Sequence, residues 1–136
     1  VQPKVTEGMN NLLCADYTEE EVKKALYSIG DLKAPGLDGM LAVFFKRFWQ
    51  TIGDQLTKEV LHVLRGGDMP DGWNDTLIVL IPQNANPVRM KDLRPISLCN
   101  VVYKLVAKVI TNRLKAILPD IISTNQSASV TGRLIS

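Results

Sequence analysis

The sequence has few residues that bind soft metals: among 136 residues there are two cysteines, Cys14 and Cys99, and one histidine, His62. So few ligands, so far apart, argue against a structural zinc site. No apolar run approaches the ~18 residues of a membrane-spanning helix, and the first residues lack the basic-then-apolar order of a signal peptide. We therefore expect a reduced, intracellular chain with no membrane contact. Because it begins with Val1, it could be a piece of a longer protein.

Familiar catalytic motifs are also missing. There is no nucleophile elbow GxSxG, no phosphate loop GxxxxGK[ST] and no HExxH. Metal-dependent catalysis needs a cluster of carboxylates, but the last 56 residues contain only Asp92 and Asp120. The acidic residues before them lie mostly in turns or on an expected helix face. The sequence therefore predicts no catalytic residue and no metal site within this chain.

Charge is distributed unevenly along the chain. Residues 1–80 contain 8 Lys and Arg against 12 Asp and Glu, a net charge of −4, whereas residues 81–136 contain 8 against 2, a net charge of +6. This asymmetry favours contact between the second part and a nucleic acid or nucleotide. The alternative is that two faces of one domain neutralise each other.

The first half of the chain predicts helices. Residues 1–16 are interpreted as an irregular lead-in, and residues 17–136 as one partial domain. A helix over 17–30 would be capped by Thr18, with Glu21 at the capping-box spacing and Gly30 at its end. A turn-rich loop at 32–39 precedes helical sequence at 40–67, which we expect to break near Gly53, with Asp54 as a possible cap. The aromatic residues of 44–49 are expected in the core or a domain interface.

The second half predicts a hairpin and a long helix. The apolar run 76–82 reads as a buried strand, and residues 93–97 as a second, antiparallel one after a ten-residue polar loop. A helix over 99–118 would end at Pro119 and be buried over more than half of its circumference. Arg113 lies within its apolar arc, so we expect an ion pair with an acidic residue of the first part. The predicted fold class is α+β, mostly helical with a small antiparallel β-hairpin.

Basic side chains are the candidates for function. Arg94, beside the basic loop residues Arg89 and Lys91, could grip a triphosphate or a backbone phosphate with two hydrogen bonds; it could also be a surface arginine paired with Asp92. Lys104, Lys108 and Lys115 form a helical stripe that could contact phosphates, or that could be a solvated face. The loop with Lys33, Gly36 and Gly39 could bring backbone N–H groups to a phosphate, or be a simple turn. Arg133, in a turn near the end of the chain, is a further candidate for nucleic-acid binding.

Five motifs occur together in one order: KAPGLDG (33–39), FFKRFW (44–49), WNDTLIVLIP (73–82), LRPISLCNVVYKLVAKVITNRLK (93–115) and NQSASVTGRLI (125–135). In this order and spacing the sequence resembles the N-terminal fingers part of the reverse transcriptase of non-LTR retrotransposons, of the long interspersed element type and especially the plant versions. The resemblance covers the chain from about residue 17 to its end. It implies helices packed around a small antiparallel hairpin.

The resemblance also implies residue roles. Arg94 matches the family arginine that grips the triphosphate of the incoming nucleotide. Gln83 stands where the family usually has a lysine, a loss of charge for which Lys91 or Arg89 could compensate. The loop containing Lys33, Gly36 and Gly39 is similar to one near the template. Residues 126–133 resemble a family segment that has a phenylalanine where this chain has Ser129. The loss of this apolar anchor predicts a looser segment or looser docking of it on the palm.

The family's catalytic aspartates lie in the palm, beyond Ser136. The expectation is therefore a chain that does not polymerise alone, either a fragment or a degenerate copy. Its full parent would bind Mg²⁺, RNA template, DNA primer and deoxynucleoside triphosphates, with the missing palm and thumb as partners. A retrotransposon protein would act in the nucleus or cytoplasm. A non-catalytic nucleic-acid-binding module and a helical protein-interaction domain remain alternatives.

Overall fold

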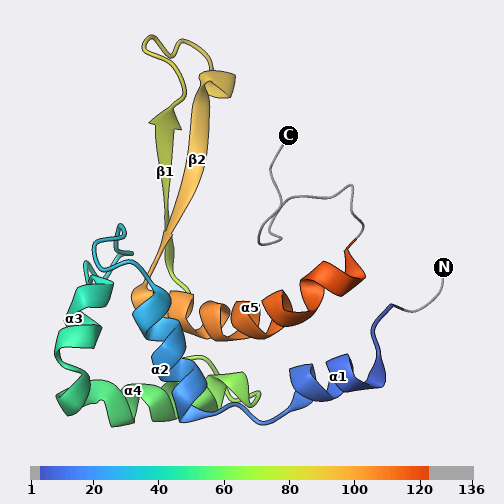
Figure 1. Cartoon of the computed structure of the whole chain (residues 1–136). Helices are drawn as coiled ribbons and strands as arrows, with labels where there is room; N and C mark the ends of the chain where they lie inside the picture. The colour runs from blue at the N-terminus through green and yellow to red at the C-terminus, as the bar shows by residue number, and fades with distance from the viewer. Residues whose placement is uncertain (1–3, 123–136) are drawn as a thin grey trace.

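The computed structural model describes residues 4–122, which form five α-helices and one β-hairpin (Figure 1). The elements run in the order α1 (Glu7–Cys14), α2 (Glu19–Ser28), α3 (Ala42–Arg47), α4 (Trp49–Leu64), β1 (Thr76–Pro82), β2 (Leu93–Cys99) and α5 (Val101–Ile121), with a 3₁₀ turn, η1 (Met90–Asp92), before β2. The predicted α+β class with a small antiparallel hairpin is confirmed. No helix in this part of the chain is long and apolar enough to span a membrane.

The lead-in is the first correction, because residues 1–16 were expected to be irregular and yet contain α1. Thr6 is its N-cap: the Thr6 Oγ1 accepts a hydrogen bond from the Met9 backbone N–H at 3.2 Å. Glu7 in the first turn suits the positive end of the helix dipole. The helix has apolar residues at helical spacing, Met9, Leu12 and Leu13, but it buries none of them, so the signal was confined to one short stretch.

Helix α2 begins as predicted. The Glu21 N–H donates to the Thr18 Oγ1 at 3.3 Å, and the Thr18 N–H donates to the Glu21 carboxylate at 2.9 Å, which completes the capping box. The helix ends at Ser28, slightly before Gly30. Its face of Val22, Ala25 and Leu26 is buried, as the spacing indicates.

The break in the second helical segment is at Phe48, not near Gly53, and Asp54 caps nothing because it lies inside α4. Gly53 is buried, and a Cβ at this position would lie 2.7 Å from the Trp49 indole. The glycine therefore admits the ring instead of ending the helix. Of the aromatic cluster, only Phe45 is buried in the core; Phe44 and Phe48 are 37% and 47% exposed.

The core lies where α2, α4 and α5 meet. The largest fully buried side chains all come from these three helices: Val22, Leu26, Val60, Val101, Leu105 and Val109. Burial of aliphatic side chains of this size stabilises a fold by roughly 1.5–3 kcal/mol each. The hairpin contributes none of these residues, so the helices carry the stability and the hairpin projects from them (Figure 1).

Helix α5 departs from its prediction in two ways. It continues through Pro119 to Ile121, and the Ile122 N–H closes it on the Leu118 carbonyl at 3.0 Å. A proline so close to a helix end removes only one backbone donor, so the helix tolerates it. Also, Ile110 and Leu114, which belong to the apolar side of the helix that was expected to be buried, are 40% and 39% exposed. The helix therefore presents apolar side chains to solvent.

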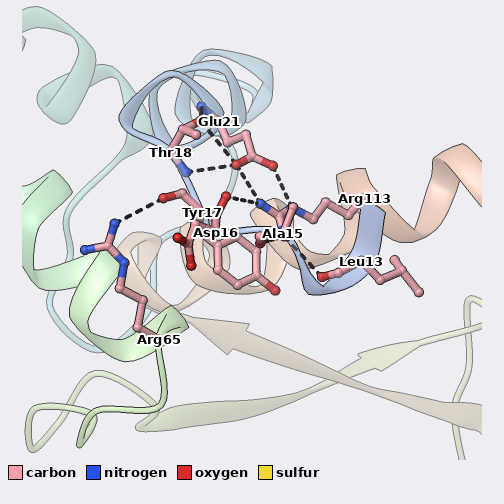
Figure 2. Close-up of polar contacts among 8 residues, drawn as sticks. All are labelled: Leu13, Ala15, Asp16, Tyr17, Thr18, Glu21, Arg65 and Arg113. Atoms are coloured by element: carbon pink, nitrogen blue, oxygen red, sulfur yellow. Dashed lines mark hydrogen bonds and ion pairs between the residues drawn. The ribbon is translucent and has the colours of Figure 1, made fainter. Parts of the chain in front are cut away.

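Arg113 confirms the expected ion pair. It is 8% exposed, and its Nε and one terminal nitrogen donate to the two Glu21 carboxylate oxygens at 2.7 and 2.9 Å (Figure 2). The remaining donors reach backbone carbonyls at the end of α1 and in the segment after it: Leu13 at 3.1 Å, Ala15, and Asp16 at 2.8 Å. This side chain therefore fastens the N-terminal segment to α5.

The hairpin pairs β1 with β2 in the expected antiparallel order, with Thr76 opposite Cys99, Val79 opposite Ile96, and Pro82 opposite Leu93. Strand β2 extends to Cys99, two residues beyond its predicted end. The prediction that β1 is buried is wrong, because its residues are exposed except Val79, which is half-buried. An apolar run indicated a strand correctly, but only a covering layer could have buried it, and none of the described residues provides one.

Candidate nucleic-acid interface

Two of the candidate residues lie on the same face of the hairpin. Ile81 is opposite Arg94, and the Gln83 N–H continues the pairing by donating to the Asp92 carbonyl at 2.8 Å. Because side chains alternate between faces along a strand, Gln83, two residues after Ile81, lies on the face of Arg94. Both line a shallow depression of about 300 Å³, together with Ile81, Pro82 and Ile96.

The Arg94 side chain is exposed and has no hydrogen-bond or ion-pair partner among residues 4–122. Its expected alternative partner, Asp92, is engaged elsewhere: its carboxylate accepts the Val88 N–H at 3.1 Å and the Arg89 N–H at 2.9 Å. The interpretation of Arg94 as an arginine paired with Asp92 is therefore wrong. A guanidinium that always carries its charge is left free for an anion.

Lys91 lies in the 3₁₀ turn Met90–Asp92, directly before β2, and is exposed. Gln83 begins the same connection from the other side. The three residues predicted to contact a nucleotide, Gln83, Lys91 and Arg94, therefore lie in the half of the hairpin farthest from the helices (Figure 1). Two of them are cations, and no acidic residue other than Asp92 lies in the connection 83–92.

The loop 32–39 is packed against the base of the hairpin. A Cβ on Gly36 would lie 2.2 Å from the Asn100 Oδ1 and 2.4 Å from the Asn100 backbone nitrogen, so only glycine fits. Gly39 has a φ of 69°, which favours glycine. The N–H groups of Asp38 and Gly39 donate to the Asn100 side chain and to the Gly36 carbonyl. These glycines and donors build the turn, so the Asp38 and Gly39 N–H groups are engaged within the fold; the phosphate-binding role of the loop stays a prediction.

The basic stripe on α5 divides into two parts. The Lys104 ammonium donates to the Ala34 carbonyl at 2.7 Å and so fastens the loop 32–39 to the helix. Lys108 is half-buried and Lys115 is exposed, and neither has a polar side-chain partner among the described residues. Lys33, in the loop, is also exposed. Lys33, Lys108 and Lys115 therefore remain available to a nucleic-acid backbone, whereas Lys104 has a structural role. Arg133 and Ser129 lie outside the described residues.

Asn100 is a residue that the sequence patterns did not reveal. It is buried at 6% exposure, its amide donates to the Gly72 carbonyl at 3.0 Å, and its Oδ1 accepts the Asp38 N–H at 3.2 Å. It therefore joins the loop 32–39 and the approach to β1 at the junction of β2 and α5. An asparagine directly before a helix indicates an N-cap, but its side chain makes no capping bond here, so local sequence reasoning would have assigned it the wrong partner.

A metal site is not apparent in this part of the molecule. No group of three or more histidine, cysteine, aspartate or glutamate side chains within residues 4–122 is arranged to hold an ion. The Asp92 carboxylate, beside Lys91 and near Arg94 in the sequence, is engaged in hydrogen bonds to the Val88 and Arg89 N–H groups. The described residues therefore do not fit a Mg²⁺ site.

Comparison with known proteins gives one informative similarity. No protein-family model matches the sequence. The chain is 35% identical over 133 residues to the uncharacterized 149 kDa protein of transposon TX1 from Xenopus laevis. The match covers 98% of this chain and 10% of that protein, so the chain spans about a tenth of the relative. The similarity supports a transposon-related origin for the whole of this segment.

Proposed function

We propose that this chain is the fingers part of the reverse transcriptase of a non-LTR retrotransposon, and that it contributes contacts to the incoming nucleotide and the template without polymerising alone. The observation that carries the proposal is the exposed, unpaired Arg94 on the same hairpin face as Gln83. The transposon TX1 similarity supports the origin of the segment, and the motif order described above supports the polymerase assignment.

The chemistry of Arg94 suits a triphosphate. Its planar guanidinium presents paired N–H donors that match two phosphate oxygens. Because no carboxylate among residues 4–122 neutralises it, its charge is available to a ligand. The residues before and after Arg94 in β2 are paired with β1, which fixes the backbone position of Arg94. This lowers the conformational entropy that the protein loses on binding a ligand.

Gln83 supports the same role in a weakened form. Its amide donates neutral hydrogen bonds where a lysine would supply a positive charge. Gln83 and Arg94 line one depression, so a lysine at position 83 would raise the positive potential on the face where Arg94 acts. The present pair therefore binds a triphosphate through one cation, with Lys91 as a second from the adjacent turn.

The exposed apolar surface supports the proposal that the chain is part of a larger protein. Large apolar side chains are exposed on α5, namely Ile110 (40%) and Leu114 (39%). Surfaces of this kind on a monomer usually mark contacts with another domain or chain. The palm and thumb of the parent enzyme would supply such partners, and would hold the Mg²⁺ that the described residues do not fit.

The remaining cations support contacts with template and primer. Lys33 on the loop 32–39 and Lys115 on α5 are exposed, and Lys108 on α5 is half-buried; we propose that they neutralise phosphates of an RNA template or a DNA primer. Each phosphate contact adds salt-dependent affinity without sequence preference.

The test is primer extension on an RNA template by a version extended through the palm. Arg94→Ala should lower activity at limiting deoxynucleoside triphosphate by tenfold or more, because a bidentate charged contact is lost (an order-of-magnitude expectation). Arg47→Ala is the matched control, because Arg47 is an exposed arginine on α3, away from the hairpin. Full activity in Arg94→Ala, or an equal loss in Arg47→Ala, would refute the role of Arg94.

The free Lys108 and Lys115 favour a second candidate, a nucleic-acid-binding module without catalysis. Titration of this chain with an RNA–DNA hybrid at two salt concentrations separates the candidates. Tight binding that weakens steeply with salt and is reduced by Lys115→Ala would support the module. Absence of binding at low salt would contradict the module and would favour a helical protein-interaction domain with no nucleic-acid role.

A further inference from the structure

The two edges of the hairpin differ, and the register shows how. The Gln83 N–H donates to the Asp92 carbonyl, so residues 83 and 92 form a hydrogen-bonded pair. Such pairs alternate with non-hydrogen-bonded pairs in an antiparallel ladder. Counting back from residue 83, Leu80 opposite Pro95 and Ile78 opposite Ser97 are non-hydrogen-bonded pairs. Ile78 and Leu80 therefore direct their N–H groups away from β2. On β2 the outward positions are Leu93, Pro95 and Ser97. Proline has no N–H, and its position at an outward site agrees with this phase of the ladder.

Strand β1 therefore has an edge that can pair, whereas the edge of β2 is interrupted. Pro95 removes the central outward donor of β2 and blocks addition of a strand there. On β1 neither the Ile78 N–H nor the Leu80 N–H donates to any group within residues 4–122 outside the hairpin ladder. Residues 76–81 carry no charge, no glycine and no proline, and Ile78 and Leu80 are 66% and 47% exposed. Pro82, at the end of β1, lacks a donor, so the edge that can pair is that of residues 76–81. Exposed edges of this composition pair readily with another strand.

We propose that β1 is a self-association edge, on which β1 of a second copy of this chain adds in antiparallel orientation, centred on Val79. The segment Leu77–Ile81 (LIVLI) is apolar throughout, so centring on Val79 lays all five residues against their counterparts. Ile78 then lies opposite Leu80 of the second copy, and each of these residues supplies its free N–H and C=O to the new ladder. Asp75 falls opposite Gln83 of the second copy, so no like charges meet.

This pairing closes on itself. It is a twofold contact in which the same edge serves both copies, and it produces a four-stranded sheet whose two outer strands are β2. Both outer edges then carry Pro95, which blocks further addition. The expected product is a dimer and not an open fibre. The inference rests on the hairpin alone and does not depend on the polymerase assignment.

The first test is sedimentation of the chain over a range of concentrations. The wild-type chain should form a dimer. Ile78→Pro removes the outward donor on β1 without removing a bond of the hairpin, and should weaken dimerisation by about tenfold or more, since one donor is lost from each copy. Ser97→Pro is the matched control, because Ser97 faces Ile78 across the ladder and directs its N–H to the other edge; its dimer should be unchanged.

The second test does not depend on how prolines are tolerated. In a background of Cys14→Ser and Cys99→Ser, Val79→Cys should form an intermolecular disulfide, because residues 79 of the two copies lie opposite each other at a separation of roughly 4.5 Å. Ile81→Cys, on the same strand face, should not, because its counterpart is displaced by four residues, roughly 13 Å. A monomeric wild-type chain, a dimer that Ile78→Pro leaves intact, or cross-linking at both positions would overturn the proposal.

Discussion

Replacing Arg113 by methionine should cost this fold a large part of its stability. The guanidinium uses all five N–H donors within the chain: two bonds to the Glu21 carboxylate and three to the carbonyls of Leu13, Ala15 and Asp16. It also lies over the Tyr17 ring, with 3.8 Å from its Cζ to the ring centroid. Methionine keeps much of the apolar stem and removes all of these contacts, so the change isolates the polar group.

The size of the effect follows from burial. Removing one partner of a buried ion pair costs about 3–5 kcal/mol when the other charge is left without solvent. Arg113 is 8% exposed but the Glu21 side chain is 31% exposed, so water can reach the carboxylate and the cost falls. We expect a loss of about 2–4 kcal/mol in the free energy of unfolding. For a domain of this size, such a loss is a large share of the total of roughly 5–15 kcal/mol.

The assay is urea unfolding followed by circular dichroism at neutral pH. Arg65→Met is the matched control, because Arg65 also reaches the segment between α1 and α2, with one bond to the Tyr17 carbonyl at 3.3 Å, but is exposed (Figure 2). Its loss should stay below about 0.5 kcal/mol. An Arg113→Met protein as stable as the Arg65→Met protein would refute the view that this arginine fastens the N-terminal segment to α5.

Three further measurements test other parts of the structure. The hydrogen bonds from Arg113 hold the pKa of Glu21 at about 2, below its usual 4.5. The ionised Glu21 therefore stabilises the fold by roughly 1–2 kcal/mol after solvent screening, and this stabilisation is present above pH 4.5 and lost as the pH falls toward 2. The stability of Glu21→Gln, followed by acid unfolding, should not show this loss between pH 4.5 and 2. Gly36→Ala should destabilise the fold by about 2–4 kcal/mol in thermal unfolding, because its Cβ meets the Asn100 backbone. Gly39→Ala has open space around the Cβ and meets only backbone strain at a positive φ, so it should cost about 1 kcal/mol. Equal costs for the two variants would contradict the close packing at Gly36. Asn100→Ala should cost about 2 kcal/mol by leaving the Gly72 carbonyl and the Asp38 N–H unpaired, and a change below 0.5 kcal/mol would show that water replaces it.

Local signals in the sequence predicted much of the fold. The Thr18–Glu21 capping box and the apolar spacing behind it predicted α2, because both act within one helical turn. The ion pair of Arg113 was expected because a charge within an apolar arc needs a partner, although the sequence could not name Glu21, 92 residues away. The strands were recognised by their branched apolar residues, and their pairing by the order of the chain.

Packing decided the errors. Gly53 looked like a helix break, but it makes room for the ring of Trp49, one turn earlier in the same helix. The apolar run in β1 was interpreted as buried, although nothing among residues 4–122 covers it. Lys104 looked like part of a phosphate-binding stripe, and only the path of the loop 32–39 shows that it bonds the Ala34 carbonyl. In each case the residue type was informative, but the sequence did not show what surrounds the residue in the fold.

The central claim is that the face of the hairpin shared by Gln83 and Arg94 binds the triphosphate of an incoming nucleotide. The most direct measurement is the KM for deoxynucleoside triphosphate in RNA-templated primer extension by the palm-extended protein carrying Gln83→Lys. The account predicts a KM lowered by about tenfold, an order expected for one added charged contact, with unchanged affinity for the primer–template. It also predicts that this gain is lost when Arg94→Ala is combined with Gln83→Lys. A KM unaffected by the charge at position 83, with or without Arg94, would contradict it.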